Sequence, residues 1–236
     1  MVVWSHVAIA GIWGGLLAVE RRAFLQAMFS RPLVAATGMG ILLDDGPSGL
    51  FVGMVLELFH LGGANLGAAL PENDTLAATS VSAVSAAMAD GGGGATPAIW
   101  SMSLILFIGM GKVGRVMDRA LERYNSRLAG KAISLAEKGE VARAMSQNLW
   151  GMWPFFVAFG AATSLCALAG YLLAPLEAKL PLQAVRALAW AYPAMASVAA
   201  AIAARGSNSP RAVVYAGAAA ALVTCLGAFA VFGDSL

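Results

Sequence analysis

Four long apolar runs constrain this chain more than any other feature of its sequence. They cover residues 2–19, 149–173, 182–204 and 212–232. A transmembrane α-helix needs about 20 consecutive, predominantly apolar residues. Only 12% of the 236 residues are charged, which is about half the share found in soluble domains. The sequence therefore predicts an all-α, polytopic membrane protein with about 6–8 transmembrane segments and no appended soluble domain.

Between the first and second of these runs, the apolar segments are shorter. Residues 33–43, 48–63 and 76–89 form three such segments, and Pro32 and Pro47 precede the first two. Short apolar segments interrupted by Gly or Pro are typical of broken or re-entrant helices, which line a cavity enclosed by protein. We therefore expect short broken helices here, followed by a full span at residues 97–111.

Residues 112–143 form a hydrophilic tract with eight Lys or Arg residues against four acids. Arg115, Arg119, Arg123 and Arg127 recur every four residues, which places them along one face of a helix. An excess of positive charge in a short connection marks the cytoplasmic side of a membrane. The stripe fits either a docking face for a cytoplasmic protein or a contact with anionic lipid.

The chain is accordingly predicted to be one membrane-embedded domain over residues 1–236. N-terminal helices occupy residues 1–111, an amphipathic cytoplasmic helix occupies residues 112–143, and three transmembrane helices occupy residues 144–236.

Glu57 is an acid inside an apolar segment, with no Lys or Arg within two helical turns along the sequence. A charge at the bilayer centre costs at least about 2.5–3.5 kcal/mol, so such acids are usually functional. Glu57 is therefore predicted to face a cavity. The alternatives are a structural buried hydrogen bond and a protonated acid shielded from lipid.

A polar segment follows Glu57. Asn65, Glu72, Asn73, Asp74 and Thr75 lie among Gly, Ala and Pro residues that favour irregular backbone. Several acceptors and amide donors together suit a neutral polyol, which is recognised through many directional hydrogen bonds. The alternative is an exposed loop in which Asp74 or Thr75 merely caps a helix that begins near Leu76.

These motifs match a known family. They are Arg31–Pro32–Leu33, the glycine-rich segment 49–53, Leu56–Glu57–Leu58, Leu61–Gly62, Asn65–Leu66–Gly67–Ala68–Ala69 and Leu76–Ala77. In order and spacing they resemble the membrane-embedded IIC component of mannose/fructose/sorbose-type phosphotransferase-system (PTS) sugar transporters. The resemblance is strong over residues 20–78, which include the substrate-motif region 30–78. Where the family has Pro-Pro-Asp, this chain has Pro71–Glu72–Asn73, so the family's acid position falls on Asn73, or on Asp74 after a shift of one residue.

The resemblance implies a function for the chain. In this family, IIC and a second membrane subunit, IID, bind a hexose of the mannose, fructose, sorbose or amino-sugar class and carry it across the bacterial inner membrane. The cytoplasmic IIB domain phosphorylates the sugar from a phosphohistidine, and IIA is the other cytoplasmic phosphocarrier. The substrate-binding residues implied here are Glu57, Asn65, Glu72, Asn73 and Asp74.

The same resemblance implies an oligomeric membrane complex. No catalytic chemistry, cofactor, metal ion or nucleic acid is expected in the chain itself. Two other functions remain open: a non-transporting membrane scaffold or sensor derived from a IIC subunit, and a carrier coupled to protons or sodium.

Overall fold

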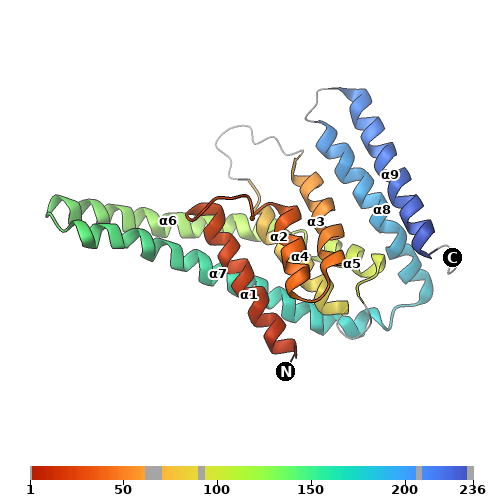
Figure 1. The fold of residues 1–236 in the computed structure, drawn as a ribbon, viewed down its shortest axis with the longest axis horizontal. Helices are drawn as coiled ribbons and strands as arrows, with labels where there is room; N and C mark the ends of the chain where they lie inside the picture. The colour runs from red at the N-terminus through yellow and green to blue at the C-terminus, as the bar shows by residue number, and fades with distance from the viewer. Residues whose placement is uncertain (1, 62–70, 90–93, 206–208, 233–236) are drawn as a thin grey trace.

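The structure is a computed structural model that describes residues 2–61, 71–89, 94–205 and 209–232. All the regular elements within these residues are α-helices (Figure 1). In chain order they are α1 (Val2–Arg22), α2 (Pro32–Leu42), α3 (Gly46–Leu61), α4 (Asp74–Ala89), α5 (Pro97–Phe107), α6 (Met110–Glu137), α7 (Val141–Glu177), α8 (Leu182–Ala204) and α9 (Pro210–Phe232). The predicted all-helical fold is confirmed.

Helices α1 and α7 run antiparallel and approach closely. The Ser164 hydroxyl on α7 donates a hydrogen bond to the Val7 carbonyl, 2.9 Å away, near the start of α1. Further along, a Cβ atom added to Gly15 would lie 2.7 Å from the carbonyl oxygen of Phe156. Small residues permit this kind of backbone approach between membrane helices, where packing rather than the hydrophobic effect drives association.

The three short apolar segments predicted from the sequence are confirmed as α2, α3 and α4, and the structure pairs them with the equally short α5 in two hairpins, α2–α3 and α4–α5. Their helices have 11, 16, 16 and 11 residues, below the roughly 20 needed to span a bilayer. Asp45 joins the tips of both hairpins, because its carboxylate accepts hydrogen bonds from the backbone amides of Ser48 at 3.3 Å and Ala95 at 3.1 Å. Asp45 itself is buried.

Helix α4 lies at the centre of the molecule. Every residue from Thr75 to Ala89 is buried, and most are Ala, Ser or Thr. The helix packs against α1, α2, α3, α5, α6 and α7. One of its hydroxyls, that of Ser82, donates a hydrogen bond to the Ala36 carbonyl on α2 at 2.7 Å. Small side chains thus allow one helix to touch six others.

The full span predicted at residues 97–111 holds only as part of a longer stretch, because the structure divides this region between two helices. Helix α5 ends at Phe107, so its 11 residues extend only about 16 Å. The chain bends at Ile108 and Gly109, and the apolar stretch continues into the first turns of α6. Only the combined stretch Pro97–Glu137 is long and apolar enough to cross a membrane.

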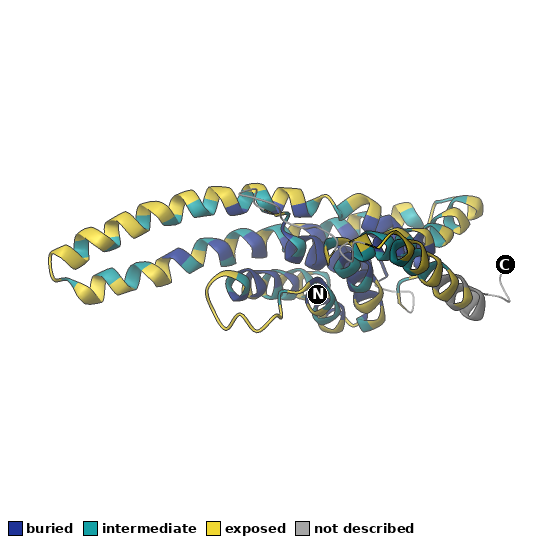
Figure 2. Ribbon diagram, turned by 90° about the horizontal axis from the view of Figure 1, so that it is seen from above, coloured by how far each residue is buried: buried dark blue, intermediate teal, exposed yellow. Residues whose placement is uncertain are grey.

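The helix predicted at residues 112–143 is found over residues 112–137 as part of α6, but it ends at Glu137 and not at residue 143. Two helices meet there at a turn, where Gly139 adopts φ +77° and ends the first of them. Helix α7 then continues without a break through Glu177, so the polar arm and the following span belong to one helix of 37 residues. The ends of α6 and α7 nearest this turn project from the body as a two-helix arm (Figure 1), and most residues of this arm are exposed (Figure 2).

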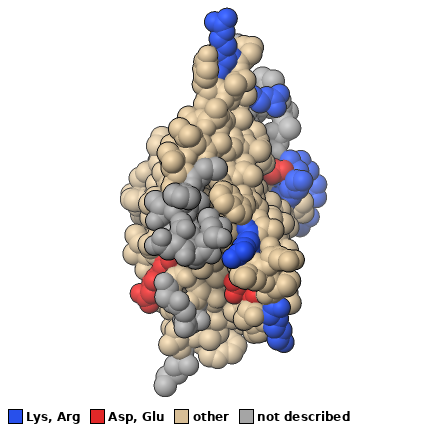
Figure 3. Space-filling model, turned by 90° about the vertical axis from the view of Figure 1, so that its right-hand side faces the viewer, with Lys and Arg blue, Asp and Glu red and all other residues tan. Residues whose placement is uncertain are grey.

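The C-terminal helices agree with the sequence. Helix α8 has the predicted bounds, and α9 begins at Pro210, two residues before the predicted start at residue 212. By length and composition, α1, α7 and α8 can each cross a membrane, as can the Pro97–Glu137 stretch. The face seen in Figure 3 carries only scattered Lys, Arg, Asp and Glu side chains. A surface of this kind is suited to contact with lipid.

Candidate substrate site and its arginine partners

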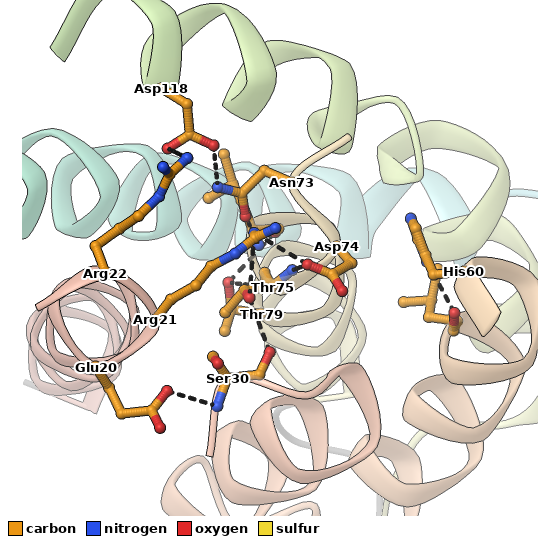
Figure 4. A network of polar contacts seen from close by, with 12 residues as sticks. Glu20, Arg21, Arg22, Ser30, His60, Asn73, Asp74, Thr75, Thr79 and Asp118 are labelled. Atoms are coloured by element: carbon orange, nitrogen blue, oxygen red, sulfur yellow. Dashed lines mark hydrogen bonds and ion pairs between the residues drawn. The ribbon is translucent and has the colours of Figure 1, made fainter. Parts of the chain in front are cut away.

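A cluster of arginines and acids lies where α1 and α3 end, where α2 and α4 begin, and beside α6 (Figure 4). We call it the arginine–acid cluster. Its ion pairs are Arg21 with Asp74, Arg22 with Asp118 and Glu122, Arg31 with Glu57, and Arg115 with Glu72. Each of the three acids predicted to bind substrate therefore has an arginine partner.

Glu57 lies one turn before the end of α3, and its side chain is 13% exposed. Nη2 of Arg31 donates a hydrogen bond to one carboxylate oxygen, and the backbone amide of Leu33 donates to the other at 3.2 Å. The sequence offers no cation near Glu57, but Arg31 lies 26 residues earlier and neutralises it across the α2–α3 hairpin. Glu57 is therefore an oriented, charge-paired acid rather than an isolated one.

Asn73 is buried immediately before α4, and both ends of its amide are bonded within the protein. The side-chain oxygen accepts a hydrogen bond from the Leu76 amide at 2.8 Å, and the side-chain nitrogen donates one to Asp118 at 2.9 Å. The first of these bonds is an N-cap. The alternative in which Asp74 or Thr75 caps a helix near Leu76 is thus wrong, because α4 starts at Asp74 and Asn73 caps it.

Asp118 on α6 is 2% exposed and was not singled out from the sequence. Besides accepting from Asn73, it lies 3.1 Å from Nη2 of Arg22. Arg22 also stacks over the ring of Phe155, 5.8 Å from its centroid. A buried charge is tolerated when it is both paired and hydrogen-bonded, and Asp118 meets both conditions.

Asp74 and Glu72 are more accessible than Glu57, each with a side chain 30% exposed. Asp74 is the first residue of α4, where a negative charge interacts favourably with the helix dipole, and it lies 3.0 Å from Nη1 of Arg21. Arg21 also donates to the Thr75 hydroxyl at 3.4 Å, and that hydroxyl donates to the Ser30 carbonyl at 2.8 Å.

The structure brings four of the five predicted site residues into this region. Glu72, Asn73 and Asp74 are consecutive at the start of α4, and Glu57 joins them through Arg31 and the adjoining Ser30. Asn65 lies outside the described residues, which resume at residue 71. A small crevice, partly open to solvent, lies between α1, α4, α6 and α7, and its lining includes Arg21, Asn73 and Asp118.

The sequence contained one signal for Asp118. Gly111, Gly114 and Asp118 are spaced by three and four residues, so they share one face of α6. That face packs on α4, and a Cβ atom at Gly114 would lie 2.5 Å from the Cβ of Asn73. Across residues 2–61, 71–89, 94–205 and 209–232, no group of three His, Cys, Asp or Glu side chains is arranged to hold a metal ion.

Apolar helices of spanning length, together with short helices packed inside them, make this chain a multi-pass membrane protein. The family described as the PTS system sorbose-specific IIC component matches residues 4–233. The chain belongs to this family of membrane-embedded sugar-transporter components, and the resemblance found in its motifs is confirmed.

Individual relatives match over shorter segments. The chain is 42% identical over 52 residues to the mannose-specific EIIC component of Escherichia coli strain K12. It is 45% identical over 49 residues to the sorbose-specific EIIC component of Lacticaseibacillus casei. These segments cover 22% and 21% of this chain, and the matches span only 20% and 18% of the two relatives' own lengths.

Two solved structures share the fold over nearly the whole chain. One is described only as a membrane protein; it has a TM-score of 0.64 and 20% identity, and the match covers 99% of this chain and 92% of that one. The other is the mannose transporter ManYZ in complex with microcin E492, with a TM-score of 0.57 and 19% identity, and the match covers 100% of this chain and 95% of that one. At these identities the likeness shows the fold alone.

Proposed function

We propose that this chain is the sugar-binding and translocating IIC subunit of a mannose-type PTS permease. It would carry a hexose inward, coupled to phosphorylation of the sugar by the partner IIB. The observation that carries the proposal is the family match over residues 4–233. The relatives named for mannose and for sorbose support a substrate of the mannose, fructose, sorbose or amino-sugar class.

The proposed substrate-binding residues are Glu57, Asn65, Glu72, Asn73 and Asp74. Ionised carboxylates accept hydrogen bonds from sugar hydroxyls, and such charge-assisted bonds are roughly twice as strong as neutral ones. The pairing of Glu57 with Arg31 and of Asp74 with Arg21 supports this role, because an arginine partner holds a carboxylate in a fixed orientation. Asn73 would act mainly by fixing the start of α4, since both ends of its amide are already bonded.

The proposed partners are the membrane subunit IID and the cytoplasmic carriers IIB and IIA. The arm formed by α6 and α7 would lie on the cytoplasmic side of a bacterial inner membrane, because its positive charges exceed its negative ones. Its stripe of Arg115, Arg119, Arg123 and Arg127 would then face an acidic surface of IIB. The complex as a whole would be oligomeric.

The test is phosphoenolpyruvate-dependent hexose uptake into membrane vesicles that contain this chain, IID, IIB and IIA. We expect uptake in the complete system and its loss in the double variant Glu57→Ala, Asn73→Ala. The matched control is Glu140→Ala, which removes an exposed arm carboxylate that lies at the N-cap position of α7 and pairs with Arg143 three residues later. Uptake that survives the double variant would remove the site assignment.

A scaffold or sensor remains the second candidate, because Asn73 stands where the family has an acid and its amide is already occupied by Asp118. In that case the chain would recruit IIB without moving sugar. Hexose binding by the purified complex of this chain with IID would count against it. The proton- or sodium-coupled alternative predicts pH-dependent uptake without phosphoenolpyruvate, and the same vesicles test it.

A further inference from the structure

The loop that joins α1 to α2 displays large apolar side chains on its surface. Phe24, Leu25, Met28 and Phe29 are 58%, 71%, 68% and 48% exposed. Residues 23–29 contain no charged residue at all. Large apolar side chains that gather on a surface mark a site of contact with a protein or a membrane.

The loop has a defined backbone. Leu25, Gln26 and Met28 all adopt positive φ angles of 49–66°, a conformation that is uncommon outside glycine and persists only where the surroundings enforce it. The buried carboxylate of Glu20 supplies part of that enforcement, because it accepts hydrogen bonds from the Phe29 amide at 3.3 Å and the Ser30 amide at 3.0 Å (Figure 4). The apolar side chains are thus held outward by a fixed frame.

The position of the loop at the end of α1 points to lipid headgroups as its surroundings. Helix α1 has 21 residues and is therefore about 31 Å long, which equals the roughly 30 Å of a bilayer's hydrocarbon core. Arg21 and Arg22 end this helix. Residues 23–29 follow at once and so lie at the level of the lipid headgroups, where amphipathic and aromatic side chains are enriched.

The helices on either side of the loop also expose apolar side chains. Ile12 and Leu16 are more than half exposed on α1, and Val34 is exposed on the first turn of α2. On helices of a membrane protein, exposed apolar side chains of this kind face lipid. The loop extends this lipid-facing surface past the end of α1.

We infer that residues 23–29 form a membrane-interface anchor, with Phe24, Leu25, Met28 and Phe29 inserted among lipid headgroups. The anchor ends in the arginine–acid cluster. Ser30 accepts the hydrogen bond from Thr75, and Arg31 holds Glu57. The depth of the loop in the membrane therefore sets the position of the segment that supports the candidate site.

The native methionines provide a test that needs no substitution. Met28 is 68% exposed and Met145, on the arm, is 67% exposed. The full chain is reconstituted into vesicles of phosphatidylethanolamine and phosphatidylglycerol, exposed to hydroxyl radicals generated in the bulk water, and analysed by mass spectrometry. We expect Met28 to be oxidised several-fold more slowly than Met145. Equal rates at the two methionines would overturn the inference.

A spin label measures the depth directly. The native cysteines are first removed by Cys166→Ala and Cys225→Ala, and the label is attached to Met28→Cys in this background. Lys138→Cys, at the turn of the arm, is the water-exposed control. The label at position 28 should collide more with oxygen and less with a water-soluble nickel chelate than the label at position 138. A label at position 28 that is as accessible to nickel as the control would contradict insertion.

The partner subunit is the competing occupant, and the same measurements distinguish it. If Met28 is oxidised as fast as Met145 in vesicles of this chain alone and is protected only after IID is added, the surface is a protein contact and the inference fails. Protection in both preparations supports the anchor. Neither readout requires sugar transport, so the anchor and the proposed function can fail separately.

Discussion

The buried carboxylate of Asp118 on α6 accepts a hydrogen bond from the side-chain amide of Asn73, 45 residues earlier, at the start of α4. The same carboxylate pairs with Arg22 at the end of α1. Three helices thus share one acid, and one of the three continues into the projecting arm (Figure 1). Movement of the arm relative to α4 would have to break this contact.

Asn73→Asp, which restores an acid at the family's position, is expected to destabilise the fold at neutral pH. Two carboxylates would then meet across the 2.9 Å that now separates an amide nitrogen from an oxygen, and a like charge raises the pKa of one of the pair. A folded-state pKa above the unfolded value means that stability present at low pH is lost as the pH rises through the folded-state pKa. The Tm of the variant should therefore fall, relative to the original chain, as the pH rises above the ordinary aspartate pKa of about 4.

The rescue of this variant is specific. Asp118→Asn in the same chain restores an amide–carboxylate pair with the roles exchanged but removes the ion pair of Asp118 with Arg22, so it should recover part of the lost Tm. A double variant that is no more stable than Asn73→Asp alone would show that the two side chains do not interact as the structure indicates.

Asp118→Ala should lower the free energy of unfolding by about 3 kcal/mol, because it breaks a buried ion pair and leaves Arg22 without its buried partner. The estimate is at the lower end of the usual range because Arg22 is one-third exposed and keeps its contact with Glu122. Glu122→Ala removes the exposed partner of the same arginine and should cost less than about 1 kcal/mol. Unfolding in detergent, followed by circular dichroism, compares the two; equal losses would argue against a special role for Asp118.

Gly160→Ala tests the close packing of α1 on α7. Its new Cβ atom would lie 2.7 Å from the carbonyl oxygen of Gly11, and overpacking of this kind costs about 1–3 kcal/mol. Gly130→Ala is the matched control, since nothing lies within 4 Å of its Cβ position and alanine favours a helix by about 1 kcal/mol over glycine. The two variants should shift the Tm in opposite directions, and shifts of the same sign would contradict the packing.

Glu57→Gln keeps the shape of the side chain and removes its charge. A hydrogen bond to a charged group is worth about 1.5–3 kcal/mol, so the apparent affinity for hexose should fall about ten- to hundredfold. The dependence of uptake on sugar concentration measures this, with Glu140→Gln on the arm as the control. An unchanged apparent affinity would exclude Glu57 from the sugar site.

Hydropathy predicted the bounds of α1, α8 and α9 within a few residues, because a helix that faces lipid is apolar over most of its length. It failed at α5 and α6, where the chain bends at Ile108 and Gly109 inside one continuous apolar stretch. It also failed at Gly139, because the charge pattern is the same on both sides of the turn. Only the positive φ of this glycine ends the helix there.

The candidate site was predictable only in part. Glu57 was found from the sequence because it is an acid inside an apolar segment. Asp74 was found because it lies in a polar segment between two apolar ones. Their partners were not found, since Arg31 and Arg21 lie 26 and 53 residues away and meet them only after the hairpins have packed. The capping role of Asn73 was missed for the same reason, because Asp118 draws it into the interior.

The complete burial of α4 has a consequence for the order in which the chain is assembled during synthesis. A helix whose Ser80, Ser82 and Ser85 hydroxyls are all buried has no side that lipid solvates well. Helix α4 packs extensively against α7, which is synthesised about 70 residues after the start of α4. Helix α4 must therefore wait at the insertion machinery, or beside α1 and the first hairpin, until α7 arrives to enclose it.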